Sequence, residues 1–140
     1  MWSSEIEHIL RFNKNFIGCY PHDELPKIKS RCDCSIIINT APSGANGEHW
    51  VAVRMTKNYC FYFDSFGVPI VNENIQRFVK KYKKAIYSYK CIQDIRSEKC
   101  GQFCIAFINN VDSIKNYKKI LNMFDTKLYL NDFIVHDLLK

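Results

Sequence analysis

Long hydrophobic runs are missing from this sequence. No apolar stretch approaches the roughly 20 residues that a membrane-spanning helix needs. The first residues, Met1–Glu5, carry neither the basic start nor the apolar centre of a secretory signal. We therefore expect a protein that does not bind membranes and is not secreted by a signal of its own.

The sequence also lacks an even number of cysteines and the spacing that is typical of metal ligands. The chain has seven cysteines, an odd count, and in the absence of a secretion signal we expect reduced thiols in a cytosolic or nuclear compartment rather than a disulfide framework. Cys32 and Cys34, with His22 upstream, are residue types that zinc prefers, but the usual two-residue gap and a second matching pair are absent. The sequence therefore predicts no metal site.

The composition lacks the marks of a disordered chain. Hydrophobic residues make up 47% and aromatic residues 14% of the 140 residues, which indicates a globular protein. This length suits one domain, and we expect residues 1–140 to form it. The net charge of +6 is compatible with an anionic partner but does not demand one.

A polar segment, residues 93–99, leads to Cys100 and then into the apolar run of residues 103–108, which predicts that Cys100 starts a helix. The free N–H groups at a helix N-terminus favour the thiolate, so we expect Cys100 to have a lowered pKa and to be nucleophilic. Its N–H could donate to an oxyanion, Gly101 would let a substrate carbonyl approach, and the Gln93 amide offers a second donor. A packed, inert thiol is the alternative.

Histidine is scarce, with four in the chain, and His49 stands at the start of an apolar, strand-like run. Asp64 closes a second such run 15 residues later. Two adjacent strands that end in these residues would hold the imidazole beside a carboxylate, which fixes the tautomer of a general base. Glu48 is a poorer partner, because neighbouring residues on a strand point to opposite faces.

Several short motifs follow one another in a fixed order: Gly47-x-His49-Trp50, then Tyr62-Phe63-Asp64-Ser65-Phe66-Gly67, then Gln93, then Cys100-Gly101-x-Phe103-Cys104. This ordered set resembles the adenovirus-type maturation proteases, the adenain family, and residues 16–18 and 36–41 resemble the N-terminal part of the same family. The likeness covers roughly residues 5–110. The family often has Glu where this chain has Asp64, which would play the same role with a shorter reach.

The resemblance implies a cysteine endopeptidase that cuts viral capsid and core precursor proteins at glycine-containing sites during virion maturation. By position, it implies His49 as the general base, Asp64 as the residue that orients it, Gln93 as an oxyanion donor and Cys100 as the nucleophile. No cofactor is required for that chemistry. Two alternatives stay open: an isopeptidase of the deubiquitinase or deSUMOylase kind, and a non-catalytic descendant that binds DNA or capsid.

The helix predicted after Asn72 carries the strongest basic cluster of the chain, with Lys83, Tyr82 and Tyr87 nearby; its basic face consists of Arg77, Lys80, Lys81 and Lys84. Such a face is either a solvated helix surface or a DNA-binding footprint. The adenain family uses DNA as an activating surface, so the resemblance implies salt-dependent, sequence-independent DNA binding.

The same resemblance implies an activating capsid-derived peptide, for which Cys91 is the candidate attachment point. A packed thiol is the alternative for Cys91. The resemblance also implies a location in the virion and in the nucleus or cytoplasm of the host cell. We expect a monomer.

The expected fold is α+β, with a small, mostly antiparallel sheet packed against the central helix that begins at Cys100, and the resemblance implies an adenain/ubiquitin-like-protease type of fold. The strands are predicted at residues 34–39, 49–54, 59–64 and 85–91. Residues 18–35, with Gly18, Pro21 and Pro26, are predicted to form a loop. Amphipathic patterns predict further helices at residues 113–124 and 129–139.

Overall fold

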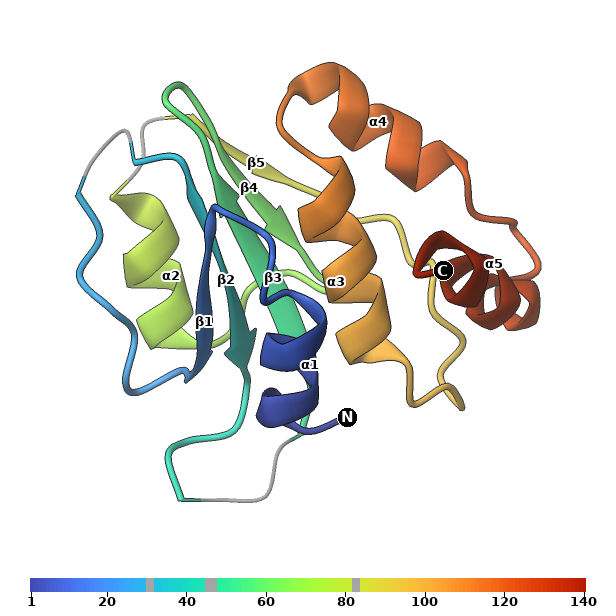
Figure 1. Cartoon of the computed structure of the whole chain (residues 1–140), viewed down its shortest axis with the longest axis horizontal. Helices are drawn as coiled ribbons and strands as arrows, with labels where there is room; N and C mark the ends of the chain where they lie inside the picture. Colours follow the sequence, from blue (N-terminus) through green and yellow to red (C-terminus); the bar gives the residue numbers. More distant parts are fainter. Residues whose placement is uncertain (30–31, 45–47, 82–83) are drawn as a thin grey trace.

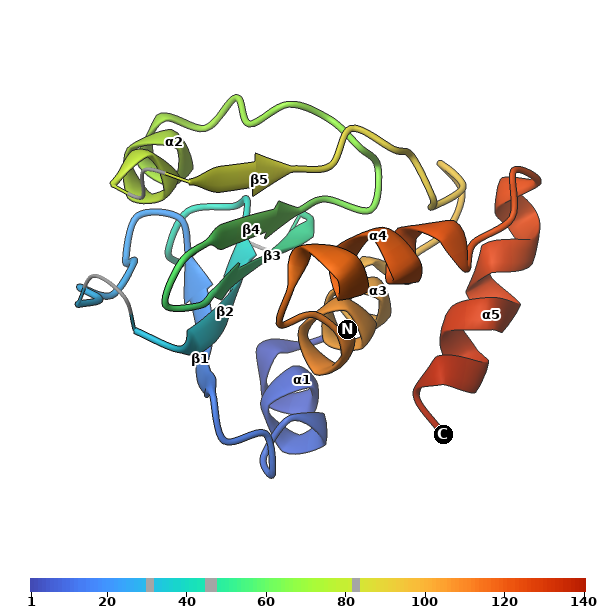
Figure 2. The same ribbon diagram turned by 90° about the horizontal axis from the view of Figure 1, so that it is seen from above.

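The computed structural model describes residues 1–29, 32–44, 48–81 and 84–140 of the chain. A central sheet carries helices on both of its faces (Figures 1 and 2). One face is covered by α2 (Glu73–Lys80). The opposite face is covered by α1 (Ser3–Ile9), α3 (Cys100–Asn110), α4 (Ile114–Asn122) and α5 (Asn131–Leu138). The molecule is therefore α+β, as the sequence predicts.

The described residues form a five-stranded sheet in the order β1-β2-β3-β4-β5. Its strands are β1 (Phe16–Pro21), β2 (Cys34–Asn39), β3 (Trp50–Met55), β4 (Cys60–Phe63) and β5 (Ala85–Tyr87). The pairs β2–β3 and β3–β4 are antiparallel, whereas β1–β2 and β4–β5 are parallel. The prediction of a mostly antiparallel sheet is therefore wrong. The chain returns from β4 to β5 through α2, and such a crossover produces a parallel pair.

Strand β1 was predicted to be a loop from Gly18 onward, and that prediction is also wrong. The strand lies at the edge of the sheet, where Pro21 can be accommodated because its missing N–H is not needed on the free side. The register shifts between Phe16 and Gly18, and Gly18 has a φ of 154°, a conformation that other residues rarely adopt. The glycine and proline therefore mark an irregular edge strand.

The three inner strands are buried along their whole length. Alternate side chains of a strand point to opposite faces, so Ile37, Ala52 and Phe61 pack towards α3 while Ile36 and Val53 pack in the cluster that includes α2. Burial on both faces explains why these segments are almost continuously apolar. It also holds the ends of β3 and β4 in fixed positions.

Helix α3 is the central helix of the main core, as predicted from the apolar run after Cys100. Phe103, Cys104 and Phe107 are almost completely buried. The rings of Phe107 and Phe63 stack with their centroids 4.6 Å apart and their planes 8° apart, which attaches α3 to β4. The first residue of α3 is thereby held at the sheet edge where β4 ends.

Strand β5 was predicted to extend to residue 91 but ends at Tyr87. The chain then crosses the turn after β4, where the N–H groups of Ile92 and Gln93 both donate to Ser65 O, at 2.9 and 3.1 Å. Gly67, with φ 68°, lies so close to this segment that a Cβ atom would be 2.7 Å from the backbone carbon of Lys90. The close crossing requires glycine and brings Gln93 next to the turn that carries Asp64.

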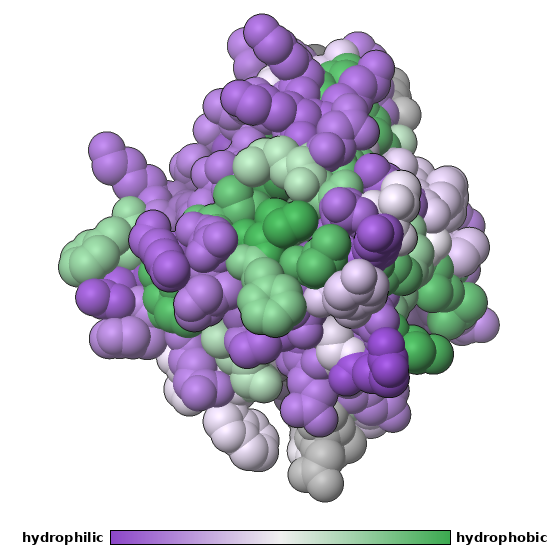
Figure 3. Space-filling view, turned by 90° about the vertical axis from the view of Figure 1, so that its right-hand side faces the viewer, coloured by the Kyte–Doolittle hydropathy of each residue, from purple (hydrophilic) through white to green (hydrophobic). Residues whose placement is uncertain are grey.

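The C-terminal part of the chain forms α4, a 3-10 turn (Leu128–Leu130) and α5, close to the predicted helices. Figure 3 shows the side of the molecule on which α4 and α5 lie, where apolar atoms gather among hydrophilic ones. Large apolar side chains of this part that remain exposed include Met123, Tyr129 and Phe133. Among the residues that the structure describes, no helix is both long enough and apolar enough to cross a membrane.

Candidate active site

His49 and Asp64 flank neighbouring antiparallel strands, His49 just before β3 and Asp64 just after β4. Because β3 and β4 are antiparallel, the start of β3 and the end of β4 lie side by side at the same end of the sheet. His49 Nε2 lies 2.8 Å from Asp64 Oδ1. The same carboxylate oxygen accepts a hydrogen bond from the Phe66 N–H at 2.9 Å, which fixes its orientation. The two residues predicted to form a base and its orienting acid are thus in direct contact.

The face of the His49 ring is covered by Phe66. The two ring centroids are 4.8 Å apart and the planes are inclined by 29°, so the rings are stacked. Asp64 holds one edge of the imidazole while Phe66 restricts rotation of its plane. No sequence pattern indicated this role for Phe66, although it lies within the motif that contains Asp64.

Cys100 is the first residue of α3 and interacts with the other side of the imidazole. Burial alone would raise the pKa of the Cys100 thiol, but hydrogen bonds with the His49 side chain and with the backbone at Trp50 and Gly101 outweigh it and lower this pKa. Since His49 Nε2 faces Asp64, Nδ1 is the ring nitrogen left for the thiol. The Cys100 thiol, which can give a proton, is therefore paired with the His49 imidazole, which can accept it, at the start of α3.

The pKa of His49 moves in the complementary direction. Burial alone would lower it, but hydrogen bonds to Asp64 and Cys100 outweigh burial and raise the pKa to about 9. A lowered thiol pKa beside a raised imidazole pKa favours the thiolate–imidazolium pair over the neutral thiol–imidazole pair. This is the electrostatic arrangement that an attacking cysteine needs.

Cys104, one helical turn after Cys100, provides an internal contrast. It is completely buried, and burial raises the pKa of its thiol well above the usual value. Its Sγ lies 3.4 Å from Trp50 O. Of these two cysteines on the same helix, Cys100 alone has the surroundings of a nucleophile, and Cys104 is a buried, packed thiol.

A cleft of about 740 Å³ opens at His49 and Cys100. Its lining also includes Trp50, Phe66, Gln93, Ser97, Glu98 and, from the N-terminal segment, Met1, Trp2 and Ser3. Trp50 Nε1 donates to Met1 O at 3.0 Å, which holds this segment at the wall of the cleft. No motif in residues 1–3 indicated that they would line the site.

Gly101 was predicted to give a substrate carbonyl access to the backbone, and the structure corrects this. Gly101 is buried, and a Cβ atom added to it would lie 3.0 Å from Met1 Sδ and 3.4 Å from Ile6 Cδ1. The missing side chain makes room for the N-terminal segment and α1, not for a ligand in the cleft.

Gln93 is 1% exposed and lines the same cleft as Cys100. Its amide is held on both sides: Ser65 Oγ donates to Oε1, and Nε2 donates to Ser97 O at 3.0 Å and to Ser97 Oγ at 3.3 Å. The amide nitrogen that would donate to an oxyanion is thus bonded to Ser97. The oxyanion role of Gln93 stays a prediction.

The predicted basic cluster lies on the other side of the molecule. Arg77, Lys80, Lys81 and Lys84 are all exposed. Arg77 and Lys80 belong to α2, which covers the sheet face opposite α3 (Figure 2), and Lys81 and Lys84 follow this helix. Tyr82 and Lys83, which the sequence associates with the cluster, and Gly47 of the His49 motif lie outside the described residues.

Cys91 is exposed, with its Sγ 3.4 Å from Gln93 O. The sequence predicts Cys91 at the end of a strand over residues 85–91, and this is wrong because β5 ends at Tyr87. Cys91 lies instead on the segment that crosses the turn after Asp64. It is separated from Gln93 by Ile92 alone. Its use as an attachment point stays a prediction.

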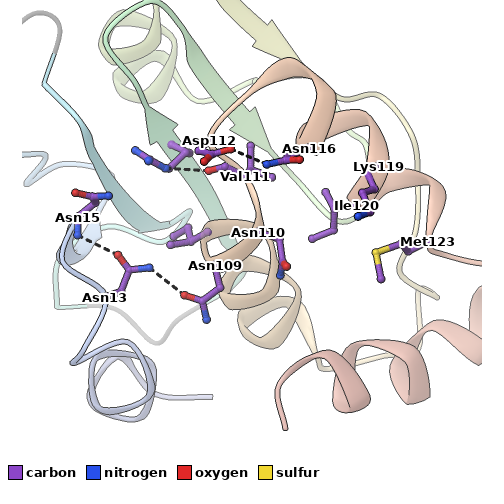
Figure 4. Close-up of a pocket in the computed structure, with 12 residues that line it drawn as sticks. Asn13, Asn15, Asn109, Asn110, Val111, Asp112, Asn116, Lys119, Ile120 and Met123 are labelled. Carbon is purple, nitrogen blue, oxygen red and sulfur yellow. Dashed lines mark hydrogen bonds between the residues drawn. The ribbon is translucent and has the colours of Figure 1, made fainter.

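A second cavity, of about 530 Å³, lies near the opposite end of α3 (Figure 4). Asparagine side chains dominate its lining, namely Asn13, Asn15, Asn109, Asn110 and Asn116. Cys100 and Asn110 are the two ends of α3, which places this cavity about 15 Å along the helix from Cys100. It contains none of the predicted site residues. Within the described residues, no group of three or more His, Cys, Asp or Glu side chains is placed to hold a metal ion.

A cysteine at the start of a central helix, paired with a histidine that an aspartate orients, is an arrangement of the cysteine hydrolase class. No family model matches the chain. The chain is 24% identical to the protease of porcine adenovirus A serotype 3 over 131 residues, a match that covers 79% of this chain and 64% of that protease. It is 28% identical to the protease of human adenovirus B serotype 3 over 116 residues, covering 70% of this chain and 51% of that protease.

These matches confirm the predicted resemblance: the chain is related to the adenain-type proteases of adenoviruses. The chain spans between half and two thirds of the length of these curated relatives.

Proposed function

We propose that this protein is a cysteine endopeptidase that cleaves viral capsid and core precursor proteins at glycine-containing sites during virion maturation. The observation that carries the proposal is the contact series Cys100–His49–Asp64 at the mouth of a cleft. The similarity to two adenovirus proteases supports a viral maturation role. A glycine at the scissile bond has no side chain to hinder the approach of its carbonyl to Cys100.

The chemistry would be acyl transfer. The Cys100 thiolate attacks the scissile carbonyl carbon, and the carbonyl oxygen becomes an oxyanion near the Cys100 N–H and the Gln93 amide. The protonated His49 then gives its Nδ1 proton to the leaving amine as the C–N bond breaks, and a thioester remains on Cys100. Neutral His49 next takes a proton from water, which attacks the thioester and releases the acid and the thiolate. Asp64 keeps the imidazole oriented throughout and stabilises its charged form.

Removal of the nucleophile tests this proposal. Cys100→Ala should abolish cleavage of a virion precursor protein and of a peptide with two glycines before the scissile bond. The matched control is Cys91→Ala, which removes an exposed thiol and should leave cleavage of the short peptide intact when no activating peptide is present. Full activity of Cys100→Ala would contradict the proposal. If the wild type cleaved a Gly-Gly isopeptide conjugate but no capsid precursor, an isopeptidase would be the better assignment.

We further propose that the basic cluster Arg77, Lys80, Lys81 and Lys84 binds DNA without sequence preference. All four side chains are exposed on or just after α2, and the net charge of the chain is +6. Retention on a DNA column should fall steeply as salt rises, and the variant Lys80→Gln/Lys81→Gln should elute at lower salt. The matched control is Lys118→Gln/Lys119→Gln on α4. Elution of the wild type independent of salt would exclude this role.

A short capsid-derived peptide is the second proposed activator, with Cys91 as its attachment point. The supporting observation is that Cys91 is exposed and lies two residues before Gln93. A peptide disulfide at Cys91 would add contacts to the segment that carries the predicted oxyanion donor. The test supplies the cysteine-containing peptide as its disulfide-linked dimer, so that the Cys91 thiol exchanges with it and releases one peptide as the free thiol. Activation should then occur in the wild type and be lost in Cys91→Ala.

A further inference from the structure

The loop of residues 94–99 contains no helix or strand, yet it lies between the predicted oxyanion donor and the nucleophile. Ser97 is its best connected residue. Its hydroxyl donates to Asp132 Oδ1 at 2.7 Å and accepts from Gln93 Nε2 at 3.3 Å and from the Lys99 N–H at 3.2 Å. One hydroxyl therefore joins the cleft to α5.

The direction of these bonds follows from the groups involved. An ionised carboxylate accepts but cannot donate, so the single proton of Ser97 Oγ points to Asp132. The lone pairs of Ser97 Oγ are then left for the Gln93 amide and the Lys99 N–H. On the other side of Gln93, the Ser65 hydroxyl donates to Oε1. The two serines thus fix which end of the Gln93 amide presents N–H groups.

Helix α5 fixes the position of Asp132. The preceding residue, Asn131, is completely buried, and its Nδ2 donates to Ile92 O at 2.7 Å and to Asp125 O at 2.9 Å. Val135, one turn further along α5, is completely buried in the core around α3. The first two residues of α5 therefore contact the chain at residues 92 and 97, on both sides of the Gln93 side chain.

We propose that Ser97, oriented by Asp132, is a positioning residue that holds the Gln93 amide for the oxyanion of the reaction. This inference rests on the proposed function. Ser97 O holds one N–H of Gln93 Nε2, and Ser97 Oγ holds the other through a longer bond, which an arriving oxyanion would share. A neutral hydroxyl is the weaker acceptor, so a developing negative charge becomes the main acceptor of this N–H while the hydroxyl still orients it. Ser97 and Asp132 act through Gln93 and do not share the bond making.

The test uses the whole chain and a fluorogenic peptide with two glycines before the leaving amine. Ser97→Ala and Asp132→Ala should each lower kcat by roughly ten- to a hundredfold with little change in KM, because a misplaced donor weakens transition-state binding. Ser97→Thr and Asp132→Asn keep a hydroxyl and an acceptor oxygen and should restore most of the activity. Asp137→Ala is the matched control, since that carboxylate lies on α5 but pairs with Lys140.

Two further readouts separate positioning from a general loss of structure. Alkylation of Cys100 by iodoacetamide forms no oxyanion, so its rate and pH dependence should be unchanged in Ser97→Ala. The double variant Ser97→Ala/Gln93→Ala should be no slower than Gln93→Ala alone. Unchanged or increased kcat in Ser97→Ala, or a further loss in the double variant, would overturn the inference.

Failure of the inference is distinguishable from failure of the proposed function. If Gln93→Ala keeps full kcat while Cys100→Ala is inactive, the protein is a cysteine protease but Gln93 is not its oxyanion donor, and the inference falls alone. If Cys100→Ala stays active, the proposed function falls as well. If Ser97→Ala does not fold, Asp132→Ala and Ser97→Thr decide the question by the same readouts.

Discussion

The two halves of the candidate site are built in different ways. His49 and Asp64 follow from the sheet: they flank antiparallel neighbours whose side chains are buried on both faces, and they meet directly at 2.8 Å. Gln93 lies outside any strand or helix, and its amide is held by Ser65 and Ser97, with Asp132 behind Ser97. His49 and Asp64 are therefore fixed by the sheet, whereas Gln93, the predicted oxyanion donor, is held by hydrogen bonds to residues of a turn and a loop.

This difference has a consequence for local stability. Strands β2, β3 and β4 form the middle of the sheet, so the His49–Asp64 pair opens only when the core opens. The loop after Gln93 has exposed residues, including Ile95 at 88% exposure, and its attachment to α5 depends on a few hydrogen bonds. We call His49 and Asp64 the sheet half of the site, and Gln93 with the loop of residues 94–99 the loop half. Changes in the sheet half should alter the reactivity of the Cys100 thiol, while changes in the loop half should lower kcat without altering that reactivity.

The largest effect is expected for His49→Ala. Loss of the general acid and base should lower kcat/KM by about 10³-fold or more. It should also remove the reactivity of Cys100 with iodoacetamide below pH 7, because the thiolate loses its protonated partner. The measurement is peptide mapping of all seven cysteines after limited alkylation. Cys100 that reacts as fast without His49 would show that the two residues are not a functional pair.

Gln93→Ala should have the next largest effect and should separate the two halves. Removal of one oxyanion donor typically lowers kcat by about 10²- to 10³-fold. Alkylation of Cys100 should stay at the wild-type rate, because the His49–Asp64 pair is untouched. The matched control is Ile95→Ala, an exposed change in the same loop that should leave both readouts unchanged. Slower alkylation in Gln93→Ala would mean that the halves are coupled.

The sequence predicts the sheet half of the site well, for a physical reason. The apolar runs before Asp64 and after His49 and Cys100 are long enough to define two strands and a core helix, and each residue lies where its run begins or ends. Strand β1 was not predicted, because Gly18 and Pro21 are typical of loops and are accommodated here by the position of β1 as an outer strand of the sheet. The parallel pairing of β4 and β5 depends on a crossover that no local pattern contains.

The loop half could not be predicted from the sequence in the same way. Ser97 has no periodic neighbours, and its partner Asp132 is 35 residues away on a helix whose packing depends on the tertiary fold. Ser65, 28 residues before Gln93, is likewise a partner by contact alone. The role predicted for Gln93 rests on its place in an ordered set of motifs and not on any pattern in the residues around it. Polar contacts between distant segments leave no periodic trace in a sequence.

Asp64→Asn should have a smaller effect, since an amide oxygen can still accept from His49 and from the Phe66 N–H. We expect kcat/KM to fall roughly ten- to a hundredfold, because the charge that stabilises the imidazolium is lost. In the wild type, the pKa of His49 is raised to about 9, so activity should persist at neutral pH and decline as pH rises through about 9. In Asp64→Asn this pKa falls, and the alkaline decline should move to lower pH.

The pH profile of kcat/KM checks this shift. Glu48→Gln is the matched control: it removes a carboxylate next to His49 in sequence, and Glu48 is exposed, so the alkaline limb should stay in place. A profile of Asp64→Asn that overlays the wild type would show that Asp64 does not set the charge state of His49.

The smallest effect on catalysis is expected for Asn131→Ala, and it tests how firmly α5 holds the loop half. The variant leaves Ile92 O without its Asn131 partner and should cost about 1–3 kcal/mol, mostly as easier opening of residues 92–99. Hydrogen exchange should quicken there and in α5 while the amides of β2, β3 and β4 keep their protection, and kcat should fall severalfold. Asn122→Ala, an exposed change on α4, should alter neither. Faster exchange throughout the sheet would mean that the two halves unfold as one unit, so that the fold holds Gln93 as firmly as it holds His49 and Asp64.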